Sequence, residues 1–287
     1  MKKISFAAFV ILFAILACNA SKAAPQTIQP SVGTVVAATM QALTANAPAT
    51  KPDGIQVSFR NVSFMIPKGL ADGSTSELVP AADEANSSPW SVAPEYVSFK
   101  LTGYAVQGSY FGAIVHVYPA EEYTKVNSWA ENSTTRLKAV LANPNGPLTN
   151  DNLPTVPFNG AAAQQYAAQA KILTFKDGTG VRMVSQYAQF PGPITKDNSF
   201  YHYEGLTKDG KYLLAILFPV SLPLQATSDN PSADGIPFPS NPTDPKAATD
   251  YYQAITDKLN AANPETFQPS LTILDMLVQS ITINSQQ

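Results

Sequence analysis

The two histidines of this 287-residue chain, His116 and His202, are the side chains best suited to metal or acid–base chemistry. Both fall in segments rich in aromatic and β-branched residues, which predict strands. With a carboxylate such as Glu204 they would make the two-histidine, one-carboxylate set that holds a transition metal. The alternative is that each histidine occupies a sheet face among aromatic side chains. His202 and Glu204 are two residues apart, so they would share a face simply because strand side chains alternate.

Arg182 is a candidate for binding an anionic ligand. It is one of three arginines and lies beside Gln186 in the strand-like segment GVRMVSQY. On an open sheet face its guanidinium would recognise a carboxylate or phosphate. The alternative is a surface arginine paired with an acid such as Asp177.

Four tyrosines gather in the same part of the chain and suggest a binding face. A half-exposed aromatic surface would suit a carbohydrate or a protein partner, while core packing and cross-strand pairing are the ordinary alternative. They are Tyr187, Tyr201, Tyr203 and Tyr212.

Composition and missing motifs narrow the function classes. The chain has no G-x-S-x-G elbow, no S-x-x-K and no phosphate-binding glycine loop, so the common hydrolase and nucleotide signatures are absent. The formal net charge of -3 gives no basic field, which argues against nucleic-acid binding. Two histidines and one cysteine also supply few metal ligands. We therefore expect no cofactor and no resident metal.

The N-terminus has the pattern of a signal peptide over residues 1–17. Two lysines precede a short apolar run, which is shorter than the ~20 residues of a membrane span. The residues Ile15, Leu16, Ala17 and Cys18 resemble the lipobox of bacterial lipoproteins. The alternative is a plain secretory signal that is cut near residue 24.

The lipoprotein resemblance implies a location and an anchor. Cleavage before Cys18 and acylation of this cysteine, including palmitate, would hold the protein at the extracytoplasmic face of a bacterial membrane, in the cell envelope. Residues 18–53 are rich in Ala, Thr, Pro and Gln, which predicts a flexible tether. The remainder, 54–287, is predicted to be one domain.

Patterns along 54–287 predict an antiparallel sheet with helices. Asp-Gly pairs at 177–178 and 209–210 indicate hairpins, so four of the strands should form a meander. The predicted strands are 56–67, 96–106, 113–118, 166–175, 181–190, 199–206, 212–220 and 280–284. The predicted helices are 119–142, 246–261 and 271–278. Proline-rich loops are predicted at 143–160 and 221–243.

This order of elements predicts an α+β fold, an αβα-sandwich-like single domain in which helices cover the antiparallel sheet. The opening VSFMIPKGL and the closing LDMLVQSITI resemble the ends of domains in the PsbP and Mog1-like superfamily. That superfamily includes assembly and binding factors without enzymatic activity, so the resemblance implies a fold and transfers no site residue.

Two function classes follow. The first hypothesis is a lipid-anchored extracytoplasmic binding or assembly module without catalytic activity, whose partners are the membrane and a protein or carbohydrate ligand. Arg182, His202 and Glu204 are its candidate ligand-binding residues. The second is a secreted hydrolase or metal-dependent enzyme that uses His116 or His202, which requires both imidazoles and an acid to meet in one cleft.

Overall fold

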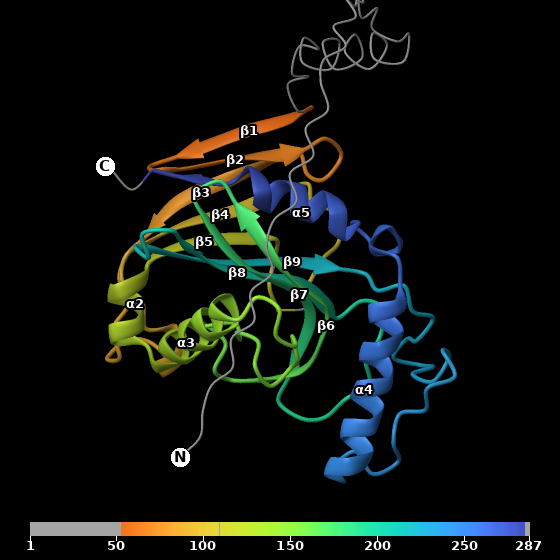
Figure 1. The fold of residues 1–287 in the computed structure, drawn as a ribbon. Coiled ribbons are helices and arrows are strands. Elements are labelled where there is room, and N and C mark those ends of the chain that lie inside the picture. The colour runs from red at the N-terminus through yellow and green to blue at the C-terminus, as the bar shows by residue number, and fades with distance from the viewer. Residues whose placement is uncertain (1–52, 109, 285–287) are drawn as a thin grey trace, which may run out of the picture. The chain divides into compact units, whose positions relative to one another are not determined.

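The computed structural model describes residues 53–108 and 110–284. The predicted signal peptide, Cys18 and the predicted tether up to residue 52 lie outside the described residues. The described part contains four α-helices and ten strands in two antiparallel sheets (Figure 1). The predicted combination of helices with an antiparallel sheet is therefore confirmed.

The larger sheet has seven strands in the order β3-β4-β5-β9-β8-β7-β6. Its strands are β3 (Gly73–Val79), β4 (Tyr96–Thr102), β5 (Ile114–Pro119), β6 (Ala163–Phe175), β7 (Gly178–Ala188), β8 (Ser199–Thr207) and β9 (Tyr212–Val220). The last four pair in chain order, each antiparallel to the next. Strand β5 then pairs with β9, which brings β3, β4 and β5 onto the same sheet.

The smaller sheet contains β1 (Gly54–Phe59), β2 (Val62–Pro67) and β10 (Thr282–Ile283), with β2 in the middle. The prediction of one strand over 56–67 is wrong, because the chain reverses at Arg60, whose φ is 55°. Non-glycine residues adopt this left-handed conformation uncommonly, so Arg-Asn is a weak turn signal compared with Asn-Gly.

Strand β3 is absent from the predicted strands, because the stretch between Gly69 and Tyr96 is polar. Its middle residues are exposed at the edge of the sheet, so the strand needs no alternating apolar pattern. The two proline-rich segments at 143–160 and 221–243 contain no regular helix or strand, as predicted.

The helices are α2 (Ala120–Val126), α3 (Ser128–Ala142), α4 (Pro245–Ala261) and α5 (Leu271–Ser280), and two short 3₁₀ turns are η1 (Pro89–Ser91) and η2 (Pro264–Thr266). The single helix predicted over 119–142 is instead two helices. Asn127 is extended, with φ of -137°, and its side chain accepts a hydrogen bond from the amide of Ala130. Asn127 therefore ends α2 and starts α3.

The seven-stranded sheet has different cover on its two faces (Figure 1). On one face, α2 and α3 pack on residues such as Val181, Met183 and Ala215. On the other, α4, α5 and the smaller sheet form the largest core with Phe99, Ile216 and their neighbours. A buried side chain of the central strands therefore packs in one of two hydrophobic cores, according to the face on which it lies.

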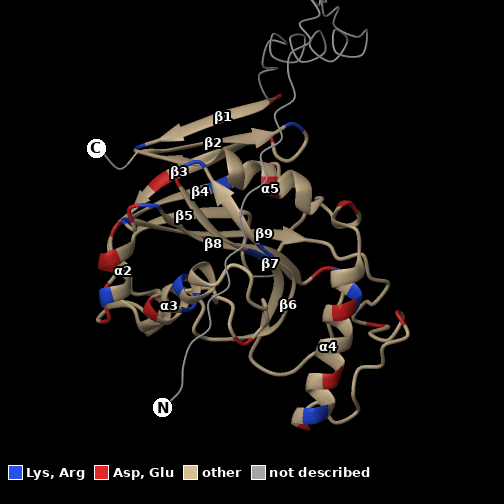
Figure 2. Ribbon diagram, in the orientation of Figure 1, with Lys and Arg blue, Asp and Glu red and all other residues tan. Residues whose placement is uncertain are grey.

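Charged side chains lie mainly on helices α2, α3 and α4 and in loops, and the central strands carry few of them (Figure 2). Within 53–108 and 110–284, every helix is too short or too polar to cross a lipid bilayer.

Candidate ligand-binding site

Three buried polar side chains meet between α3 and β8. The hydroxyl of Ser133 donates a 2.6 Å hydrogen bond to Oε2 of Glu204, and Nε2 of His202 lies 3.0 Å from Oε1 of the same carboxylate. All three residues have no exposed surface. The prediction that His202 and Glu204 share a sheet face is confirmed.

The order of these groups differs from that of a catalytic triad. A serine nucleophile needs its hydroxyl bonded to the histidine that takes its proton, with the acid behind that histidine. Here the carboxylate of Glu204 stands between Ser133 and His202, and the Ser133 hydroxyl also accepts a bond from the amide of Thr155. These hydrogen bonds connect α3, β8 and the loop at Thr155, so the three side chains have a structural role.

His116 lies on the same sheet face as His202 but is two strands away from it. The register aligns His116 with Ala215 and Ala215 with Glu204, which puts the outer two backbones roughly 10 Å apart. Nδ1 of His116 is 3.0 Å from the hydroxyl of Tyr118, and burial lowers the pKa of His116 to about 4. No group of three or more His, Cys, Asp or Glu residues in the described part is placed to hold a metal ion.

Arg182 lies on the opposite face of the sheet, where it is only 2% exposed. Its Nε is 3.2 Å from Oδ1 of Asp275 in α5, and that carboxylate also accepts a hydrogen bond from Tyr201. Nη1 of Arg182 donates to the carbonyl of Gln169. Asp177, the partner considered from the sequence, instead accepts a bond from the amide of Ile283. Arg182 therefore fastens α5 to the sheet and does not meet His202 or Glu204.

The four tyrosines separate in the same way. Tyr201 and Tyr203 are buried on the α5 side, where their hydroxyls donate to Asp275 and to the carbonyl of Leu173. Tyr212 is partly buried against the same core. Only Tyr187 reaches the pocket described next.

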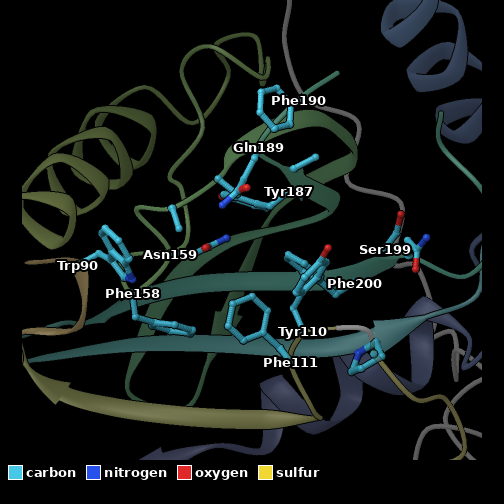
Figure 3. A pocket seen from close by; sticks show the side chains of 16 residues that line it. Trp90, Tyr110, Phe111, Phe158, Asn159, Tyr187, Gln189, Phe190, Ser199 and Phe200 are labelled. Carbon is cyan, nitrogen blue, oxygen red and sulfur yellow. The ribbon is translucent and has the colours of Figure 1, made fainter. Parts of the chain in front are cut away.

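A pocket of about 630 Å³ opens on the face of the sheet that α3 covers in part. Figure 3 shows the side chains that line it. Its volume is in the usual range for small-ligand sites. Rings line it from five separate parts of the chain: Trp90 in η1, Tyr110 and Phe111 between β4 and β5, Phe158 between α3 and β6, Tyr187 and Phe190 at the end of β7, and Phe200 in β8.

The inner wall of the pocket is a fixed aromatic layer. Phe111 packs edge-on against Phe158 and Phe200, with ring centroids 5.7 and 6.0 Å away. Phe200 in turn stacks on Tyr187 at 5.7 Å. The Tyr187 hydroxyl donates to Oε1 of Gln164 and accepts from the amide of Val156. These contacts pack the rings of the wall against one another and tie Tyr187 to its neighbours.

The outer rim is unlike the wall because its rings face water. Tyr110 is 83% exposed and Phe190 is 78% exposed, and no other large hydrophobic residue of the described part is more than 47% exposed. Both lie at the same pocket, on loops separated by 80 positions. Two rings left in solvent at one opening favour a binding surface.

The polar groups at the pocket are neutral. Asn159, Gln189, Asn198 and Ser199 contribute amides and a hydroxyl, and the residues described as lining the pocket include no Asp, Glu, Lys, Arg or His. Burial raises the pKa of the Tyr187 phenol well above its usual value, which keeps it protonated. The lining can stack on a ligand and exchange hydrogen bonds with it, but it offers no general acid or base near neutral pH.

Comparison of the chain with protein-family models, curated proteins and solved structures finds no match. The resemblance to the PsbP and Mog1-like superfamily and the lipobox resemblance stay predictions. The pocket therefore has to be interpreted from its own geometry.

Sequence reasoning found Tyr187 but missed the other rings of the pocket. A signal was present, because aromatic residues stand next to turn-forming residues in four predicted loops or strand ends: SSPW, GSYFG, PFNG and QFPGP. A ring in such a segment has no periodic face that would carry it into the core. It is therefore a candidate for binding.

Proposed function

We propose that residues 54–287 form one α+β sandwich domain whose meander of β6 to β9 supports a carbohydrate-binding site. The whole chain would be a lipid-anchored extracytoplasmic binding module without catalytic activity. The observation that carries the proposal is the pair of exposed rings, Tyr110 and Phe190, at the rim of a neutral aromatic pocket.

A sugar fits this lining better than other small ligands do. A pyranose ring has a face of C–H groups, which are attracted to the negative face of an aromatic ring, and an edge of hydroxyls, which pair with amides. The pocket offers both, since the rings of Tyr110 and Phe190 and the amides of Asn159 and Gln189 all line it. A hydrocarbon chain would leave those amides unpaired when it displaced their water.

The absence of charge at the lining also favours a binding role. Glycoside hydrolysis uses a pair of carboxylates on either side of the scissile bond. Glu204, a carboxylate of the central strands on this sheet face, is buried and is already bonded by Ser133 and His202, and it does not line the pocket. The enzymatic alternative has no comparable observation in its favour.

Substituting the rim rings tests the carbohydrate proposal. Covering roughly 60 Å² of one ring at ~25 cal/mol per Å² is worth about 1.5 kcal/mol, or about tenfold in Kd. Tyr110→Ala and Phe190→Ala should each weaken binding by about that factor, because each removes a stacking surface. Titration calorimetry with cellotetraose, maltotetraose and chitotetraose, after a screen on a glycan array, gives the measurement.

Two matched variants provide the control. Met276→Ala and Ile55→Ala also remove exposed hydrophobic side chains, at 47% and 42% exposure, but away from the pocket. They should leave the affinity unchanged. The proposal fails if no glycan binds, if a fluorescent fatty acid binds in the pocket instead, or if the rim variants bind as tightly as the controls.

The lipid anchor is tested at Cys18. Cys18→Ser removes the thiol that would carry the diacylglyceryl group, so the protein should move from the membrane pellet to the soluble fraction and lose palmitate labelling. Two or three acyl chains are needed for stable attachment, since one chain binds only marginally. The circular dichroism spectrum of the domain should stay the same. A Cys18→Ser variant that still pellets with membranes contradicts the anchor.

A further inference from the structure

A second hollow of about 410 Å³ lies next to the aromatic pocket. The two hollows share Asn159, Ala162 and Tyr187 as lining residues. A shallower hollow of about 330 Å³ follows and shares Trp129 and Thr155 with the second. The surface therefore offers three neighbouring hollows, and a ligand longer than one sugar ring could reach more than one of them.

The junction between the hollows is closely packed. Trp90 of the first hollow and Trp129 of the second meet edge to face, with centroids 6.2 Å apart. A Cβ at Gly160 would lie 2.6 Å from Cε2 of Trp129 and 2.8 Å from Cβ of Trp90, so only glycine fits there. Asn127 ties the two segments together by donating to the carbonyl of Trp90. The spacing of the two hollows is thus set by the fold.

The second hollow differs from the first in carrying a charged donor, Arg136. Its guanidinium makes a 3.4 Å hydrogen bond to the carbonyl of Leu153 and no ion pair with any residue that the structure describes. Arg182, by contrast, is paired with Asp275. Most of the five guanidinium N–H donors of Arg136 are therefore available to a ligand.

The neighbours of Arg136 restrict what kind of anion would bind. Asp151 lines the same hollow and would repel a multiply charged group such as a phosphate. A single carboxylate surrounded by hydroxyls suits this lining better, because Asp151 and Asn159 can accept from hydroxyls while Arg136 pairs with the carboxylate.

We infer that the ligand is an acidic oligosaccharide of the uronate type, which places one residue on the rim rings of the first hollow and a carboxylate at Arg136 in the second. The inference rests on the carbohydrate-binding function proposed above. It adds the charge of the oligosaccharide and a length of more than one sugar residue.

Methyl esterification provides the test, because it removes the charge and keeps the length and stereochemistry. Tetragalacturonate, tetraguluronate and a hyaluronan tetrasaccharide are each titrated against their methyl esters by calorimetry. At least one acid should bind about tenfold or more tightly than its ester, as a charge-assisted bond to Arg136 requires. Arg136→Gln should abolish this difference, and Arg136→Lys should retain part of it. The thermal midpoint of each variant shows whether the fold is intact.

The outcomes separate this inference from the function beneath it. If neutral tetrasaccharides bind at the rim rings and no acid binds, or if acids and esters bind equally, the acidic class is overturned and the carbohydrate site stands. The same holds if the preference for acid survives Arg136→Gln. If neither neutral nor acidic oligosaccharides bind, both proposals fail.

Discussion

Several side chains that look chemically active in the sequence are fixed by hydrogen bonds inside the fold. Glu204 holds Ser133 and His202, and Asp275 holds Arg182. A buried polar or ionisable side chain is stabilised by such partners, because leaving it unpaired is costly. Residue type alone therefore suggested ligand binding or catalysis at positions where the side chains connect helices to the sheet.

His116 should make the stability of the domain depend on pH. Its pKa is about 4 in the folded state, because burial disfavours the charged imidazole, against 6.5 when exposed. A lowered pKa means that the contribution is complete above pH 6.5 and is lost as the pH falls toward 4. The loss is at most about 3 kcal/mol, at 1.36 kcal/mol per unit. His116 keeps some contact with solvent, which makes this an upper bound.

The measurement is urea unfolding between pH 4 and 7 for the native chain and for His116→Gln. Glutamine keeps a polar group near Tyr118 but does not titrate in this range. The stability of the native chain relative to the variant should fall by up to about 3 kcal/mol as the pH falls from 7 to 4. Parallel curves across the range would contradict the assignment.

At the scale of elements, one residue organises the pocket side of the sheet. Asn127 caps α3 through the amide of Ala130 and donates to the carbonyls of Trp90 and Val92 in the segment around η1. Its side chain thus places the η1 ring at the pocket and starts the helix that covers the neighbouring sheet face.

Asn127→Ala should lower the free energy of unfolding by about 2 to 3 kcal/mol, since a cap, one buried and one partly buried hydrogen bond are each worth up to about 1 kcal/mol. It should also weaken glycan binding, because Trp90 loses its tie. Asp244→Ala is the matched control: it removes the exposed cap of α4 and should cost about 1 kcal/mol without affecting affinity. Equal effects of the two variants on stability and binding would refute this role of Asn127.

The elements that sequence reasoning located well have strong local signals. Pro245 after Asp244 marks the start of α4, and its apolar spacing carries the helix to Ala261. The failures are local as well. The Arg60 turn lacks glycine, and β3 is an exposed edge strand without an apolar face. In both cases pairing with a neighbouring strand, which the sequence does not display, decides the structure.

At the scale of the whole molecule, the two faces of the seven-stranded sheet carry different features. Its α5 face contains the charged cluster around Asp275 and the largest core, and its α3 face contains the pocket. The site could be predicted only in part, because its rings come from segments as distant as Trp90 and Phe200 and no periodic pattern relates them. The strand order β5-β9-β8-β7 brings them to one end of the sheet.

The hairpin of β1 and β2 also determines how the domain would respond to tension. Gly54 pairs with Pro67 at the open end of the hairpin, so a pull on the chain at Asp53 loads the cross-strand pairs one after another and not all together. Only Val57 and Phe59 of β1 reach the core, and both are partly buried. Under force, β1 would separate from β2 and release about 20 Å of chain, at ~3.3 Å for each of its residues. The pocket takes no residue from β1. A bound ligand would therefore be retained while the chain lengthens by this amount.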